Sequence, residues 1–201
     1  MLISAGEVIV NAYDDALNVG GDGTDLIIEG GYVYARAMNN DGIDGNGNVY
    51  VKGGLVYAIG AREPEVAIEA NTEENKKLYV QGGTIIAVGG LERGASITGG
   101  TCKYTTSWTE NTWYALYNGS ELVAAFQTPT KATSGSNPGG GGPGGNRPPG
   151  GGGGPSGGGS QQLVVYTSST PALESGVTVS GGTTYFGGVA NIGGTVSGGT
   201  S

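Results

Sequence analysis

The feature that most constrains this chain is a pair of glycines that recurs between short alternating strands. The clearest copies are residues 26–35, which read LIIEGGYVYA, and residues 49–58, which read VYVKGGLVYA. Alignment on the second glycine gives Gly6, Gly31, Gly54, Gly83 and Gly100, at successive steps of 25, 23, 29 and 17 residues. A period of this length indicates a solenoid, and glycine at each corner allows a tight bend that a Cβ atom would oppose.

The same alignment predicts which side chains point inward. Stacked coils place equivalent residues about 4.8 Å apart, so aliphatic residues at matching positions form continuous columns. Before the corner the inward positions are Met1, Ile3, Leu26, Ile28, Val49, Val51, Leu78, Val80, Ala95 and Ile97; after it they are Val8, Val33, Ala35, Val56, Ala58, Ile85 and Ala87; a third segment adds Leu17, Ile43 and Ile68. Three short strands per coil, with no helical periodicity, predict an all-β, right-handed parallel β-helix.

The repeat pattern ends at Gly100, and we expect one domain in three parts. Residues 1–103 form the coils, and residues 104–133 and 161–201 form a C-terminal antiparallel β cap. Within the cap, residues 113–126 read as a hairpin that turns at Asn118-Gly119. Residues 134–160 consist almost entirely of Gly, Pro and Ser, so we expect a disordered insertion loop.

The net charge of the chain arises within residues 1–110. Residues 1–110 hold 15 of the 17 acidic and 7 of the 9 basic residues, which accounts for the whole net charge of −8. Such a surface argues against nucleic acid and anionic membranes as partners, and suits cations or a polyanion reached through cations. The sequence has no histidine, and its single cysteine, Cys102, is expected to be a buried free thiol.

Acidic and amide side chains recur on the third segment of successive coils. In register, Asp14, Asn40 and Glu65 form one column, Asp15 and Asp41 a second, and Asn18, Asp44 and Glu69 a third. Stacked oxygen ligands suit Ca²⁺, which takes six to eight oxygens in flexible geometry, so the candidate metal ligands are Asp14, Asp15, Asn40, Asp41, Asp44 and Glu69. The alternative is that these side chains cap turns of their own backbone.

Tyrosines recur on the outward positions. Tyr50 and Tyr79 align on one outer face, and Tyr34 and Tyr57 align on the next. Exposed rings can stack against sugars, and with Lys52 nearby these four tyrosines are the candidate carbohydrate-binding residues. The alternative is a set of aromatic ladders that stiffen the exterior of the solenoid.

Basic residues near the acids leave an enzymatic alternative open. A calcium-dependent polysaccharide lyase needs a base to remove a proton beside the substrate carboxylate, and Lys52, Arg62, Lys76 and Lys77 are the candidates. Scattered lysines and arginines are usually solvated, so the sequence favours no catalysis. Without histidine, no nucleophile–histidine–acid set is possible.

The segments 14–18 (DDALN) and 40–44 (NDGID), with the intervening Gly-Gly-x-Val-x-Ala units, resemble a family of bacterial secreted "carbohydrate-binding domain-containing" proteins. The resemblance implies a parallel β-helix that binds Ca²⁺ and polygalacturonate without hydrolysing it. The third coil departs from the pattern, with Val66-Ala67-Ile68, which leaves Glu69 as the ligand expected there. Residues 169–176 resemble the closing stretch of that family, which implies that residues 161–182 continue the sheet of the hairpin.

We therefore expect a non-catalytic, monomeric module that binds acidic polysaccharide with Ca²⁺ outside the cell or at its surface. The alternatives are the lyase and a surface adhesin or structural spacer with no small ligand. Residues 1–6 align with residues 78–83, so the chain opens in mid-repeat. We expect an N-terminally truncated piece, for which the lack of a signal peptide is uninformative.

Overall fold

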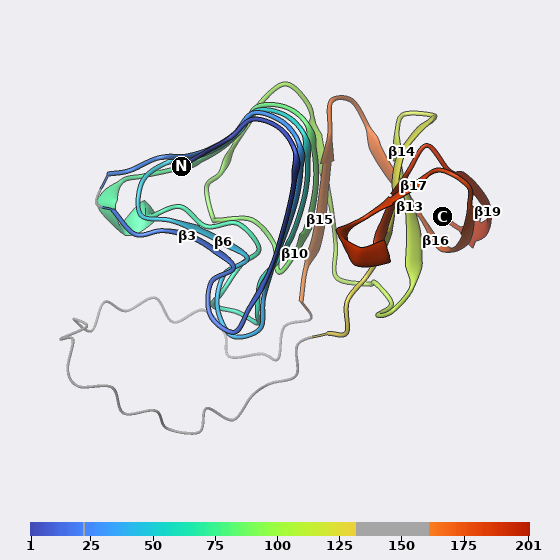
Figure 1. Ribbon diagram of the computed structural model, residues 1–201, viewed down its shortest axis with the longest axis horizontal. Coiled ribbons are helices and arrows are strands. Elements are labelled where there is room, and N and C mark those ends of the chain that lie inside the picture. Colours follow the sequence, from blue (N-terminus) through green and yellow to red (C-terminus); the bar gives the residue numbers. More distant parts are fainter. Residues whose placement is uncertain (22, 132–160) are drawn as a thin grey trace.

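The computed structural model describes residues 1–21, 23–131 and 161–201. The protein is all-β, with a β-solenoid of about three turns followed by an antiparallel sheet, as Figure 1 shows. This confirms the predicted fold class. Within the described ranges, no helix has the length and apolar character that crossing a bilayer requires.

Two sheets form the long sides of the solenoid, and a narrow ladder forms the third side. Sheet A consists, in spatial order, of β1 (Leu2–Ile3), β4 (Leu26–Ile28), β7 (Val49–Val51), β9 (Leu78–Val80) and β11 (Ser96–Ile97). Sheet B consists of β12 (Thr101–Thr105), β15 (Leu163–Thr167), β10 (Thr84–Val88), β8 (Leu55–Ile59), β5 (Tyr32–Ala37) and β2 (Glu7–Ala12). The third side pairs β3 (Leu17–Val19) with β6 (Ile43–Gly45) and continues through single bridges from Ile43 to Ile68 and from Ile68 to Leu91.

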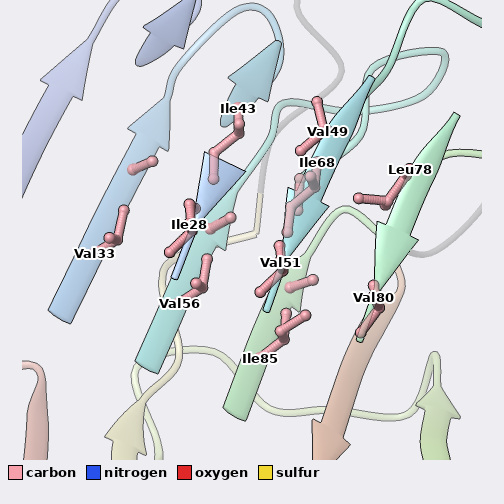
Figure 2. Packing of buried hydrophobic residues seen from close by; sticks show 14 of the residues in the cluster. Ile28, Val33, Ile43, Val49, Val51, Val56, Ile68, Leu78, Val80 and Ile85 are labelled. Carbon is pink, nitrogen blue, oxygen red and sulfur yellow. The ribbon is translucent and has the colours of Figure 1, made fainter. Parts of the chain in front are cut away.

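The strand register confirms the inward columns. Ile28 pairs with Val51 and Val51 with Val80 in sheet A, while Val33 and Val56 pair in sheet B. Figure 2 shows these side chains in rows that point into the interior, together with Ile43 and Ile68 from the third side. Met1 departs from the expectation: it is 47% exposed, because no coil of the described chain covers the first one.

The corner glycines also follow the prediction, with one exception. Gly6, Gly31, Gly54 and Gly83 have φ between 80° and 88°, and a Cβ atom on Gly31 would lie 2.7 Å from the carbonyl oxygen of Gly6. At the last corner the positive φ, 68°, belongs to Gly99 rather than to Gly100. The bend differs there because the strand that follows it does not stack on β10.

The strand that does stack on β10 comes from much later in the chain. β15 pairs antiparallel with β10 on one side and with β12 on the other (Figure 1). The expectation that residues 161–182 all continue the sheet of the hairpin is therefore wrong for β15, which completes sheet B. The boundary placed at residue 103 is wrong for the same reason, since β12 extends to Thr105 in this sheet.

The C-terminal sheet is antiparallel and covers the outer face of sheet B. Its strands, in spatial order, are β17 (Thr183–Tyr185), β18 (Ala190–Ile192), β14 (Glu121–Gln127), β13 (Trp113–Asn118), β16 (Pro171–Ser180) and β19 (Thr195–Thr200). The hairpin of β13 and β14 confirms the predicted turn, with φ of 64° at Gly119. A second apolar cluster, which includes Ile86, Leu116 and Phe126, fills the space between this sheet and sheet B.

The remaining features are short helical turns, the single cysteine and the glycine-rich segment. The described residues form two 3₁₀ turns, η1 (Thr72–Glu74) and η2 (Phe186–Gly188). Cys102 is free and half-buried against the solenoid core, and this burial raises the pKa of its thiol. The segment 134–160, expected to be disordered, lies outside the described residues.

Candidate functional site

The third side of the solenoid carries a column of acids. Asn18 pairs with Asp44, and the bridge between Ile43 and Ile68 places Glu69 next in line. The bridge from Ile68 to Leu91 adds Glu92, which the sequence interpretation missed. We call Asp44, Glu69 and Glu92 the acidic column.

A signal for Glu92 was present in the sequence. An apolar residue followed by an acid occurs as Ile43-Asp44, Ile68-Glu69 and Leu91-Glu92. The short step from Gly83 to Gly100 suggested that the last coil had lost most of its third side. One residue of it remains in register, and that residue is enough to place Glu92.

Asp15 and Asp41 bind the backbone of the following coil. Asp15 Oδ1 accepts a hydrogen bond from the Asp41 amide at 3.0 Å, and Asp41 Oδ1 accepts one from the Val66 amide at 2.6 Å. Asp41 is only 3% exposed. These two oxygens are therefore engaged by backbone amides, as in the alternative to a metal site, but the amides belong to the next coil and not to turns of their own backbone.

Asn18 connects Asp15 of the first coil with Asp44 of the second. Its side-chain amide donates to Asp15 Oδ2 at 2.9 Å and to Asp44 Oδ2 at 2.8 Å. One amide group thus holds two carboxylates from successive coils. Asp14 lies exposed in the turn between β2 and β3, and Asn40 is half-buried with its carbonyl oxygen bound by the Ala61 amide at 2.9 Å.

The acidic column is electrostatically unbalanced. Burial, with the nearby charges of Asp15 and Asp41, raises the pKa of Asp44 to about 6. Burial and a hydrogen bond with Asp41, reinforced by the charges of Asp41, Asp44 and Glu92, raise the pKa of Glu69 to about 9. The pKa of Glu92 is also raised, mainly by burial. Burial first, and then the neighbouring carboxylates, therefore favour the protonated form of Glu69 near neutral pH.

The donor set of this column consists of carboxyl and amide oxygens, the chemistry that Ca²⁺ prefers. Among the described residues, however, no three acidic, cysteine or histidine side chains converge closely enough to form a ready-made metal site. Two of the carboxylate oxygens are also engaged by backbone amides. An ion bound here would have to draw Asp44, Glu69 and Glu92 together.

A groove of about 940 Å³ opens beside the last member of the column. Its lining includes Glu63, Glu73, Glu92, Arg93 and Thr106. The groove exists because the third side is reduced to a single residue at Leu91, while the two loops of the preceding coil project past it. The charge of its lining is predominantly acidic, with Glu63, Glu73 and Glu92 against Arg93.

The two tyrosine columns have different surroundings. Tyr50 and Tyr79 stack with ring centroids 4.9 Å apart and 7° between their planes, on the outer face of sheet A. The Lys52 ammonium lies 5.7 Å from the centre of the Tyr50 ring and 3.4 Å from Glu29 Oε1. Tyr50, Tyr79 and Lys52 therefore lie together, as the sequence predicted, and the two rings also form a ladder.

The expectation that Tyr34 and Tyr57 are exposed is wrong. Their side chains do point outward from sheet B, but Tyr34 is 6% exposed and Tyr57 is fully buried, because the C-terminal sheet covers them. Tyr57 packs edge-on against Phe126 and donates a hydrogen bond to the Gln127 carbonyl oxygen at 2.8 Å. These rings hold two sheets together and have no free face for a sugar.

Comparisons with protein-family models, with curated proteins and with solved structures found no match to this chain. The resemblance drawn from the Asp-Gly-Ile segments and the glycine corners therefore remains a prediction.

Proposed function

We propose that the protein is a non-catalytic binding module that takes Ca²⁺ on the acidic column and uses it to bind an acidic polysaccharide. The observation that carries the proposal is the column itself, in which Asp44, Glu69 and Glu92 follow one another in register. Burial, together with the charges of neighbouring carboxylates, raises the pKa of all three carboxyl groups, which supports the proposal. A divalent cation would supply compensating positive charge.

The residues that would hold the ion are Asp44, Glu69 and Glu92, with Asp41 beside them. Bound Ca²⁺ would offer positive charge to the carboxylates of a uronate polymer, which the acidic face would otherwise repel. The adjoining groove gives such a polymer a place to lie. The half-buried rings of Tyr50 and Tyr79, with Lys52, would supply further contacts along sheet A.

The test is calorimetric titration of chelator-stripped protein with Ca²⁺, compared with an Asp44→Asn, Glu69→Gln variant. We expect saturable binding that the variant loses, while Glu121→Gln, an exposed carboxylate in the C-terminal hairpin, retains it. Polygalacturonate should then bind in Ca²⁺ and not in chelator. Absence of Ca²⁺ binding to the unmodified protein would overturn the proposal.

A second candidate is a structural spacer or adhesin with no small ligand. It is favoured by the structural roles that the candidate residues already have. Asp15 and Asp41 cap backbone amides, Tyr50 and Tyr79 stack on each other, and Tyr57 is buried under the C-terminal sheet. Failure of both titrations would leave this candidate in the lead.

One further measurement distinguishes the lyase alternative from the non-catalytic binding module. Lys52 forms an ion pair with Glu29 on sheet A, whereas the acids occupy the third side. A rise in ultraviolet absorbance from unsaturated uronate, dependent on protein concentration, would identify a lyase. Binding that leaves the polymer intact would support the module.

A further inference from the structure

A seam between the solenoid and the C-terminal sheet carries two cavities of about 130 Å³ and 250 Å³. Both are lined by Arg36, near the end of β5, and by Thr130, in the segment that follows β14. The cavities therefore adjoin through these two residues. The larger one, which also reaches Lys131, is comparable in size with a single sugar ring. We call this region the Arg36–Lys131 seam.

The charge of the seam is opposite to that of the chain. Among the described residues, its lining contains Arg36 and Lys131 but no aspartate or glutamate, in a protein whose net charge is −8. Along sheet B, Arg36 stands between the uncharged Asn11 and Ile59. It is the single charged residue of that row, on a surface where acids outnumber bases.

Neither cation pairs with a carboxylate in the part of the chain that the structure describes. The ion pair formed there is Lys52 with Glu29. The Lys131 ammonium lies 4.7 Å from the centre of the Trp108 ring, and the Glu110 carboxylate accepts the backbone amide of Lys131 at 2.8 Å. Arg36 therefore lines both cavities, and Lys131 lines the larger one with its ammonium resting on the Trp108 ring beside it.

Neutral hydrogen-bonding groups surround the two cations. The Tyr34 hydroxyl lies beside Arg36, Thr130 contributes a hydroxyl, and Asn111 lines the smaller cavity. Gln161 lines the larger cavity and is fixed by donating to the Gly60 carbonyl oxygen at 2.9 Å. A ligand that combines one negative charge with several hydroxyl groups would match this lining.

We infer that the Arg36–Lys131 seam binds the carboxylate of a hydroxylated organic acid, of which a uronic acid is the type that fits best. A guanidinium presents a planar fork that matches a carboxylate, and an ammonium adds a second charge-assisted hydrogen bond. The cavity size favours one ring rather than a polymer segment. The ligand class is shared with the proposed function, but this site lies elsewhere and needs no metal ion.

The test uses the full chain in the presence of a chelator, with galacturonate titrated by calorimetry. We expect saturable binding that weakens by about tenfold or more in Arg36→Gln and in Lys131→Gln, since each removes a hydrogen bond to a charged group. Lys103→Gln, an exposed lysine on β12 outside the seam, should bind as the unmodified protein does. Affinity should also fall as salt is added.

Neutral galactose and inorganic phosphate complete the experiment. Weak or absent binding of both would support recognition of a carboxylate on a hydroxylated ring. Equal binding of galactose, tighter binding of phosphate, absence of galacturonate binding, or unchanged affinity in both variants would overturn the inference. Lys131→Gln keeps the test valid if Arg36→Gln fails to fold, because Lys131 lies in a connecting segment. Chelator excludes the calcium mechanism, so failure of the proposed function leaves this result unaffected.

Discussion

The two outward tyrosine columns arise from the same repeat and have opposite environments. Tyr50 and Tyr79 stack on the free face of sheet A, whereas Tyr34 and Tyr57 lie under the C-terminal sheet. The repeat determines that each pair aligns in register and points outward, although the Tyr50 and Tyr79 rings stack while the Tyr34 and Tyr57 rings meet edge-on. It does not determine what lies beyond, because the covering sheet comes from sequence outside the repeat. An outward aromatic row is therefore evidence of register and not of a binding face.

If the two tyrosine pairs differ in burial as described, the largest loss of stability should follow substitution of Tyr57. Tyr57→Ala should lower the free energy of unfolding by about 3–5 kcal/mol, because it empties a fully buried ring site between two sheets. Chemical denaturation would measure the change. A loss below about 1 kcal/mol would mean that the C-terminal sheet does not pack on sheet B as described.

A smaller loss is expected when the ring is kept and only the hydroxyl is removed. Tyr57→Phe leaves the Gln127 carbonyl oxygen without the hydrogen bond that it accepts at 2.8 Å. We expect a loss of about 1–3 kcal/mol, the range for a buried polar group deprived of its partner. The same denaturation experiment applies, and an unchanged midpoint would show that the carbonyl finds another donor.

The third side of the solenoid differs from both tyrosine pairs, because it carries carboxyl groups instead of stacked or buried rings. The folded-state pKa of Glu69 is raised to about 9, so this residue favours folding most at pH below its unfolded pKa. As pH rises from about 4.5 towards 9, the unfolded chain loses the proton first, and stability should fall. Thermal melts in chelator should show Tm falling by several degrees over that interval.

Glu69→Gln supplies the control for the pH effect. The amide cannot ionise, so the decline of Tm with pH should become shallower, while Glu121→Gln on the exposed hairpin should leave it unchanged. Added Ca²⁺ should reduce the decline in the unmodified protein if the acidic column binds the ion. Identical pH profiles for the protein and Glu69→Gln would contradict the assignment.

The smallest stability effect is expected at the half-buried pair of Tyr50 and Tyr79 on the outer face of sheet A. Tyr50→Ala removes one partner of a stacked surface pair and should cost about 0.5–1.5 kcal/mol. If the rings contact polysaccharide, the affinity of Tyr79→Ala for polygalacturonate should also fall about tenfold. Unchanged affinity would assign this pair to the ladder alone.

Periodicity made the inner half of the fold predictable. The spacing of the corner glycines fixed the register, and Val33, Val56 and Ile85 could be aligned without knowledge of any contact. What could not be predicted was the placement of β15, because a short Val- and Tyr-containing strand fits either sheet equally well. The burial of Tyr34 and Tyr57 depended on that same unpredicted part of the chain.

The candidate site was predictable to a similar extent. The columns of Asp15 with Asp41 and of Asp44 with Glu69 followed from register alone. The use of Asp41 as a cap for the Val66 amide did not, because the choice between binding a cation and binding a backbone donor depends on distances that a sequence does not contain. The Arg36–Lys131 seam could not be predicted from the sequence either. Its two cations are far apart in the chain and line a common region only because the C-terminal sheet packs on sheet B.

The position of β15 has a consequence for the order of folding. β10 is translated early, yet one of its two edges is filled only when residues 163–167 arrive, after the hairpin of β13 and β14 has been made. Until then β10 presents an unpaired edge that could recruit a foreign strand. The strand that pairs with β10 is thus supplied by sequence far downstream of the coils. We expect the pairing of β15 with β10 to be the slowest folding step, slower than the pairing of successive coils, because it closes a long loop.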